Sequence, residues 1–173
     1  MLAGRSNVGK SSLINALTRQ SLARTSAEPG KTRLANVYEI ARGDGAGRTS
    51  FYLIDLPGYG YARGGNAGFD ALVKDVFARN PAALLLVDVR HPALESDRHA
   101  WGWISASDGP RAVVATKIDK LARGERIRAM RQLESVYDGP VAPVSAASGE
   151  GMDELWKLIV KLLKPRPTTS PSA

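Results

Sequence analysis

The chain has 173 residues and a formal net charge of +7, which suits one globular domain with a sizeable core. The absence of cysteine excludes disulfides and thiolate metal sites, and two histidines are too few for a histidine-based metal centre. No charged and apolar leader opens the sequence and no apolar run approaches a membrane span, so we expect a cytoplasmic protein without a membrane partner. The positive charge indicates either an anionic partner such as RNA or simply a well-solvated surface.

The first motif runs from Gly4 to Ser11 and fits glycine, four residues, then glycine-lysine-serine. Glycines let the backbone curl so that successive N–H groups point at phosphate oxygens. Lys10 adds a charge for the β- and γ-phosphates, and the Ser11 hydroxyl is a ligand for Mg²⁺. The alternative is a glycine-rich turn that only joins a strand to the helix expected from Leu13 onward.

Only three residues precede Gly4, whereas a phosphate loop normally follows a buried strand of about five or six residues. We therefore expect the first strand to be largely missing. Its neighbours would then have unpaired edges, and the sheet would contain an apolar gap.

A polar stretch at residues 20–32, broken by Pro29 and Gly30, predicts a mobile loop after the first helix. It ends in Thr32, whose hydroxyl can complete a Mg²⁺ shell when a γ-phosphate is present. The alternative is an ordinary loop threonine, and its place between the phosphate loop and the next strand is what favours the metal.

Two strands, Leu34 to Ile40 and Ser50 to Leu56, are joined by a glycine-rich turn and should form an antiparallel hairpin. The second runs into Asp55-Leu56-Pro57-Gly58. We expect Asp55 to act on Mg²⁺ through water and the Gly58 amide to bond a γ-phosphate oxygen. Asp-x-Pro-Gly also makes an ordinary turn.

Helices and strands alternate through the middle of the chain. We expect a second mobile segment at 58–68, helices at 69–79 and 97–104, and a strand at 82–89 that is buried on both faces. The tryptophans of the second helix, Trp101 and Trp103, favour packing over stacking on bases.

A strand at 111–115 leads into Thr116-Lys117-Ile118-Asp119, the motif that selects the base. One carboxylate accepts from both N1–H and the 2-amino group of guanine, and adenine offers no such pair. The stem of Lys117 can lie over the purine and the ribose. The same residues can also cap a helix N-terminus, and both roles are compatible.

Three elements are expected after this motif. A helix at 120–134 carries a run of arginines that is either a solvated face or an RNA contact. A strand at 141–144 ends in Ser145-Ala146, where a backbone N–H can reach guanine O6. An amphipathic helix at 152–164 should dock on the sheet rather than on a membrane. The arginines of the run are Arg123, Arg126, Arg128 and Arg131.

The alternation of elements predicts an α/β fold with three layers and a mostly parallel sheet with one antiparallel strand. The motifs occur in the order seen in Ras-like GTPases of the P-loop class. More narrowly, the chain resembles the EngB/YihA/YsxC family of bacterial ribosome-assembly GTPases. The likeness rests on Gly4 to Asn15, Pro29 to Thr32, Asp55 to Ala62, Asp88 to His91, Asp97, and Thr116 to Lys120.

The resemblance implies one GTP-binding domain at 1–164, followed by a disordered tail at 165–173. It implies a protein that binds GTP and GDP, hydrolyses GTP slowly with Mg²⁺, and switches its affinity for precursors of the large ribosomal subunit and their rRNA. A role in cell division and septation is a further candidate, and we expect a monomer. The residues expected to bind GTP are Gly4, Arg5, Ser6, Asn7, Val8, Gly9, Lys10, Ser11, Ser12, Pro29, Gly30, Lys31, Thr32, Asp55, Leu56, Pro57, Gly58, Thr116, Lys117, Ile118, Asp119, Val144, Ser145 and Ala146.

For catalysis we name Lys10 and Thr32, and we assign no general base, because Tyr59 stands where many Ras-like enzymes place glutamine. The Mg²⁺ ligands expected are Ser11, Thr32 and, through water, Asp55. Asn7 is either a ligand for K⁺, a second candidate cofactor, or a residue that suits the backbone geometry of the loop.

Two other functions remain open from the sequence. One is a GTP-gated binding module with negligible hydrolysis. The other is a Ras-like GTPase of tRNA modification, against which the Tyr59-Gly60-Tyr61 signature argues, as does the lack of a second domain in this sequence.

Overall fold

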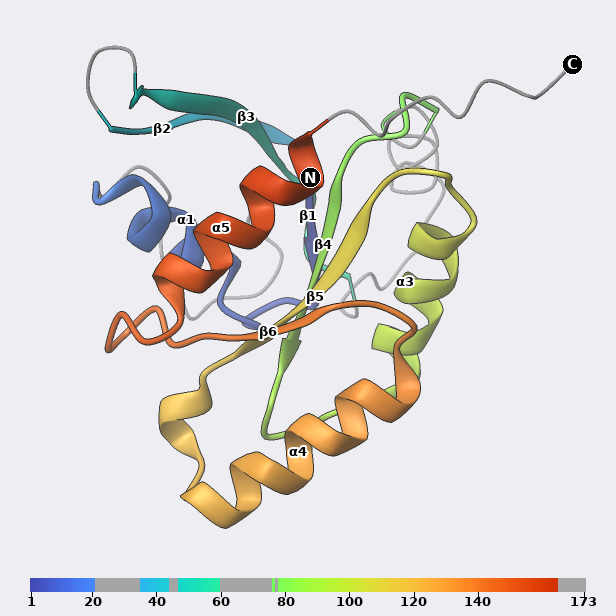
Figure 1. Cartoon of the computed structure of the whole chain (residues 1–173). Helices are drawn as coiled ribbons and strands as arrows, with labels where there is room; N and C mark the ends of the chain where they lie inside the picture. Colours follow the sequence, from blue (N-terminus) through green and yellow to red (C-terminus); the bar gives the residue numbers. More distant parts are fainter. Residues whose placement is uncertain (21–34, 44–46, 60–75, 77, 165–173) are drawn as a thin grey trace, which may run out of the picture.

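The computed structural model describes residues 1–20, 35–43, 47–59, 76 and 78–164. A six-stranded sheet in the order β2-β3-β1-β4-β5-β6 forms its centre (Figure 1). Only β2 and β3 pair antiparallel, and the other neighbours are parallel, so the predicted α/β fold is confirmed. The elements are β1 (Leu2–Gly4), α1 (Lys10–Thr18), β2 (Asn36–Arg42), β3 (Thr49–Asp55), β4 (Ala83–Asp88), α3 (Glu95–Ser105), β5 (Arg111–Thr116), the 3-10 helix η2 (Ile118–Lys120), α4 (Arg123–Val136), β6 (Val141–Pro143) and α5 (Met152–Leu163).

β1 is the short first strand that the sequence predicts, and it lies between β3 and β4. Leu2 pairs with Asp55 on one side and with Leu84 on the other. At the place of the expected apolar gap, Leu2 is fully buried and its side chain packs in the core that contains α1 and α5. The expectation of unpaired edges is therefore wrong for β4, which pairs with all three residues of β1, while β3 pairs with it at one position.

Helices cover both faces of the sheet: α1 and α5 lie on one side, and α3 and α4 on the other (Figure 1). β4 is buried at every position because alternate side chains enter opposite cores. Leu84 and Leu86 pack in the core of α1 and α5, whereas Leu85 and Val87 pack in the core of α3 and α4. The packed sheet thus fixes the carboxyl ends of its parallel strands along one edge, and the sequence motifs begin at those ends.

α5 docks on the sheet as predicted. Leu155 and Ile159 are buried in the core that also contains Leu2, while Lys157 and Lys161 are exposed. The helix is amphipathic, so packing on an apolar sheet face satisfies its pattern. None of the helices in the described ranges is long and apolar enough to cross a bilayer.

Several element ends differ from the sequence prediction. β2 extends to Arg42, because the hairpin register pairs Arg42 with Thr49. α4 begins at Arg123 instead of residue 120, because η2 forms a separate turn and the Glu125 carboxylate accepts from the Ala122 N–H at 3.1 Å. Most of the predicted loop at 20–32, of the mobile segment at 58–68 and of the helix at 69–79 lies outside the described residues, as does the tail at 165–173.

The two tryptophans of α3 behave differently. Trp101 is buried, donates its indole N–H to Asp138 at 2.7 Å and meets Tyr137 edge-on, so the packing prediction is confirmed for it. Trp103 is 37% exposed and its ring lies beside that of His99. The choice between packing and stacking on bases therefore stays a prediction for Trp103.

Candidate nucleotide-binding site

The phosphate loop leaves β1 at Gly4 and enters α1 at Lys10. Only glycine fits at the first position, where a Cβ would lie 2.8 Å from Val8 Cγ1 and 3.2 Å from the Leu86 carbonyl oxygen. Asn7 and Gly9 have φ of 63° and 110°, in the left-handed region that glycine and asparagine tolerate best. The resulting curl brings the Lys10 ammonium back to donate to the Gly4 carbonyl at 3.1 Å.

Asp55 ends β3 close to Lys10. The residue is 3% exposed, and its Oδ1 has no hydrogen-bond partner among the described residues. Burial raises the pKa of Asp55 to about 6, an effect that the positive charge of Lys10 opposes, and burial lowers the pKa of Lys10. A buried carboxylate oxygen that lacks a partner suits a water on a divalent cation, so the residues present fit Mg²⁺.

The segment after β3 runs against the phosphate loop. The Ser6 N–H donates to the Tyr59 carbonyl at 3.2 Å, and Arg5 and Tyr59 form a parallel bridge. Gly58 approaches so closely that a Cβ there would lie 2.8 Å from Ser6 Oγ. The segment that follows the Asp-x-x-Gly motif (Asp55 to Gly58) is therefore in direct backbone contact with the phosphate loop.

The base motif follows β5. Thr116 donates its hydroxyl to the Val8 carbonyl at 2.8 Å, which joins the end of β5 to the phosphate loop. The Ser145 hydroxyl donates to Asp119 Oδ1 at 2.7 Å, and the Lys120 ammonium lies 3.3 Å from Oδ2. These contacts, Ser145 first, hold the pKa of Asp119 below its usual value. The Ser145 hydroxyl contact was missed by the sequence, which pointed only to a backbone N–H.

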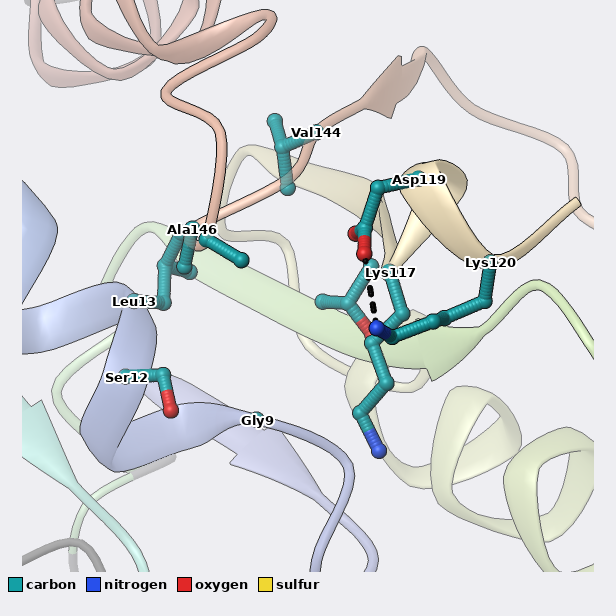
Figure 2. A pocket seen from close by; sticks show the side chains of 10 residues that line it. Gly9, Ser12, Leu13, Lys117, Asp119, Lys120, Val144 and Ala146 are labelled. Atoms are coloured by element: carbon teal, nitrogen blue, oxygen red, sulfur yellow. Dashed lines mark ion pairs between the residues drawn. The ribbon is translucent and has the colours of Figure 1, made fainter.

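An open pocket lies between the phosphate loop and the base motif (Figure 2). Figure 2 shows Asp119 and Lys120 on one side of it and Ser12 and Gly9 on the other. Apolar walls with one carboxylate match the flat, partly polar shape of a purine. The pocket is lined by Gly9, Ser12, Leu13, Thr116, Lys117, Asp119, Lys120, Val144, Ala146 and Ala147.

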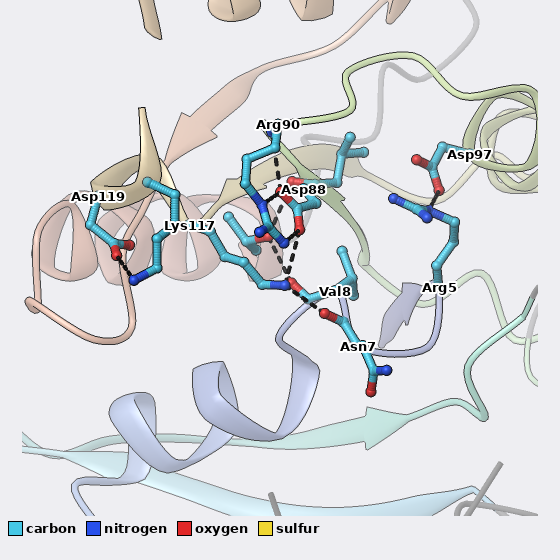
Figure 3. A network of polar contacts seen from close by, with 11 residues as sticks. Arg5, Asn7, Val8, Asp88, Arg90, Asp97, Lys117 and Asp119 are labelled. Atoms are coloured by element: carbon cyan, nitrogen blue, oxygen red, sulfur yellow. Dashed lines mark hydrogen bonds and ion pairs between the residues drawn. The ribbon is translucent and has the colours of Figure 1, made fainter. Parts of the chain in front are cut away.

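Lys117 is held in place by the buried Asp88, whose role does not follow from the sequence motifs. Its ammonium donates to the Asn7 carbonyl at 2.6 Å and lies 2.9 Å from Asp88 Oδ2. Arg90 donates to both oxygens of Asp88, at 2.9 and 2.7 Å (Figure 3). Burial favours protonation of Asp88, but the hydrogen bonds from Arg90 and Lys117 outweigh it and hold its pKa well below the usual range. The signals for Asp88 in the sequence were its position at the end of an apolar strand and its place among the residues that carry the family resemblance.

The structure brings most of the predicted site residues to one edge of the sheet. The phosphate loop, Ser11 and Ser12 at the start of α1, and the segment from Asp55 to Gly58 meet the two base-side segments there. Ile118 and Val144 join those segments, since the Ile118 N–H donates to the Val144 carbonyl at 3.3 Å. Pro29, Gly30, Lys31 and Thr32 lie outside the described residues.

Comparisons of sequence identify similar proteins over most of the chain. A family model described as a 50S ribosome-binding GTPase matches residues 1–117. A Chlorobium luteolum protein named Probable GTP-binding protein EngB is 44% identical over 164 residues, covering 90% of this chain and 76% of its own. A protein of the same name from Anaeromyxobacter sp. (strain K) is 39% identical over 179 residues, covering 96% and 83%.

Solved structures with a similar fold include an EngB protein and Era. A crystal structure of a probable GTP-binding protein EngB has a TM-score of 0.66 and 25% identity, covering 95% of this chain and 98% of its own. Aquifex aeolicus Era bound to GDP and AlF4⁻ has a TM-score of 0.80 at 22% identity, covering 98% of this chain. The present chain spans 58% of that Era chain, and the likeness to it shows the fold alone.

Proposed function

The chain belongs to the EngB family of GTP-binding proteins and is a GTPase, and from this premise we propose that it is a slow, Mg²⁺-dependent switch in assembly of the large ribosomal subunit. The observation that carries the nucleotide part is the pocket between Gly9 and Asp119. Its oriented carboxylate is suited to guanine, and the adjoining curled loop is suited to phosphates.

Charge neutralisation is the chemistry that this site is built to supply. Lys10 stands at the phosphate loop, and Ser11 and Asp55 would hold Mg²⁺, with Asp55 acting through water. Thr32 stays the proposed third ligand. Bound Mg²⁺ would neutralise charge on the phosphate oxygens.

Tyr59 supports a slow reaction without a general base. Its hydroxyl donates to Asp97 at 2.9 Å, and burial raises its pKa far above the ordinary value. A hydroxyl that is engaged in this way and remains protonated does not take a proton from water. The same observation favours a second candidate, a GTP-gated binding module with negligible hydrolysis of its own. GTP hydrolysis measured with and without large ribosomal subunits separates the two, since only the switch is expected to turn over GTP.

The ribosomal part of the proposal draws on the family description and on charge. The matching family model is described as 50S ribosome-binding, and the net charge of +7 suits rRNA. A solved structure of Era contains a piece of 16S ribosomal RNA, which is a finding about Era. By the family resemblance we further propose a cytoplasmic monomer that also supports cell division, and we favour this role over tRNA modification.

Asp119→Asn tests the base assignment. The variant should bind GDP at least about tenfold more weakly, because it loses a charge-assisted hydrogen bond, and it should gain affinity for xanthosine diphosphate. Asp108→Asn makes the same change at an exposed aspartate and should alter neither affinity. Full GDP affinity in Asp119→Asn, with no gain for the xanthine nucleotide, would show that this carboxylate does not read the base.

Asn7 decides whether K⁺ is a second cofactor. Its φ of 63° fits the local explanation, while its side-chain amide oxygen is a suitable neutral ligand for a large monovalent cation. We propose that K⁺ accelerates single-turnover hydrolysis, measured in potassium and sodium at matched ionic strength, in the wild type but not in Asn7→Ala. Identical wild-type rates in the two salts, with and without ribosomal subunits, would remove K⁺ from the proposal.

A further inference from the structure

We propose that Asp97 is a positioning residue for the response to the γ-phosphate: it holds Tyr59, and with it Gly58, against the phosphate loop. The inference rests on the proposed function, in which the Gly58 amide bonds a γ-phosphate oxygen. It adds a specific element, α3, to the machinery that distinguishes GTP from GDP.

Three parts of the chain meet on one carboxylate oxygen. Asp97 lies in the first turn of α3 and is fully buried. Its Oδ1 accepts from the Tyr59 hydroxyl at 2.9 Å and lies 3.2 Å from Arg5 Nε. Figure 3 shows Arg5 reaching from the phosphate loop to Asp97. The phosphate loop and the Asp-x-x-Gly segment therefore share one anchor on α3.

The burial of Asp97 indicates that its contacts with Tyr59 and Arg5 serve more than packing. Burial raises the pKa of Asp97, and the contacts from Tyr59 and Arg5 oppose that rise. Its second oxygen, Oδ2, is buried without a hydrogen-bond partner in the described part of the chain. Apolar residues often replace a buried ion pair with equal or better stability, so packing alone is a poor reason for a carboxylate here.

The backbone contacts place this anchor beside the sensing amide. Tyr59 accepts from the Ser6 N–H at 3.2 Å, and Gly58 packs directly on Ser6. Gly58 is thus held next to the phosphate loop by contacts within the chain itself. Pre-ordering of this kind lowers the cost of binding a ligand that contacts Gly58. GTP makes that contact in the proposed function, and GDP, which has no γ-phosphate, does not.

Tyr59→Phe is the sharpest test, because it removes one hydroxyl and keeps the ring. With Mg²⁺ present, affinity for a non-hydrolysable GTP analogue should fall about three- to tenfold, as expected for one lost hydrogen bond to a carboxylate, while GDP affinity stays within about twofold. Tyr137→Phe is a matched control. The Tyr137 hydroxyl is buried near Asp97 but has no hydrogen-bond partner among the described residues, so both affinities should be unchanged.

Asp97→Asn provides a second variant. The amide oxygen still accepts from Tyr59 but loses the charge that faces Arg5, so the analogue should weaken less than in Tyr59→Phe. An unchanged ratio of analogue to GDP affinity in Tyr59→Phe would overturn the proposal, as would an equal loss for both nucleotides, which indicates general damage to the site. Failure of the wild type to bind either nucleotide would instead overturn the proposed function.

Discussion

Asp55, Asp88 and Asp119 lie in one site, yet the surroundings shift their pKa values differently. Burial raises the pKa of Asp55 to about 6, with Lys10 as the opposing charge. Asp88 is also buried, but Arg90 and Lys117 hold its pKa far lower. Ser145 keeps the pKa of the more exposed Asp119 low. Asp55 is therefore the carboxylate poised to gain most from a cation, whereas Asp88 already has its partners.

Asp55→Asn should stabilise the nucleotide-free protein at pH 7 and abolish its Mg²⁺-dependent gain in nucleotide affinity. The raised pKa means that the folded state binds the proton more tightly than the unfolded chain. The stability that Asp55 contributes is therefore fully present below about pH 4 and is lost as pH rises through 6. Removing the buried charge should raise the free energy of unfolding by about 1 to 3 kcal/mol at pH 7. Urea denaturation from pH 7 down to pH 4 should show this gain shrinking.

Asp88→Asn provides the opposite control. A depressed pKa in the folded state contributes stability that is present above the unfolded pKa and lost as pH falls through the folded one. Asp88→Asn should therefore destabilise the protein at pH 7. Destabilisation by Asp55→Asn at pH 7 would contradict the buried, unpartnered state of that carboxylate.

At the scale of elements, sequence patterns predicted the type of each element whose burial sets its pattern of apolar residues. The apolar run of β4 and the amphipathic pattern of α5 gave the correct element types because the sheet buries both. Element ends were less accurate, as at α4, because capping by Glu125 depends on local geometry. Contacts such as Tyr59 with Asp97 carry no local signal, since they join residues far apart in the chain. Site residues that belong to local motifs could therefore be predicted from the sequence. Residues that join the site only through tertiary contacts could not.

Leu155→Ala tests the docking of α5 on the sheet. Leu155 is fully buried, so its truncation should lower the free energy of unfolding by about 2 to 5 kcal/mol. Leu163→Ala makes the same chemical change on the same helix at a side chain that is 45% exposed, and it should cost only about 0.5 kcal/mol. Chemical denaturation measures both, and similar losses would mean that α5 does not use this face.

At the scale of the whole molecule, the positive charge remains to be assigned to a surface. Arg126 of α4 pairs with Glu150 at 2.5 Å, whereas Arg123, Arg128 and Arg131 are exposed. None of these three lines the nucleotide pocket. Another three exposed cations lie on α5 and at its C-terminal end: Lys157, Lys161 and Lys164. The two sets of three cations therefore offer equal positive charge at different places on the molecule.

Replacing Arg123, Arg128 and Arg131 together by glutamine decides between an RNA contact and a solvated face. If α4 contacts rRNA phosphates, the triple variant should bind large-subunit precursors more weakly in the GTP-analogue state, and the slope of log affinity against log salt should fall by about two to three. GDP affinity should stay unchanged. The same replacement of Lys157, Lys161 and Lys164 removes equal charge from α5 and its C-terminal end, so it measures the effect of net charge alone. Equal weakening by both triple variants would mean that α4 is only a solvated face, because a contact surface must be sensitive to where the charge lies and not only to how much there is.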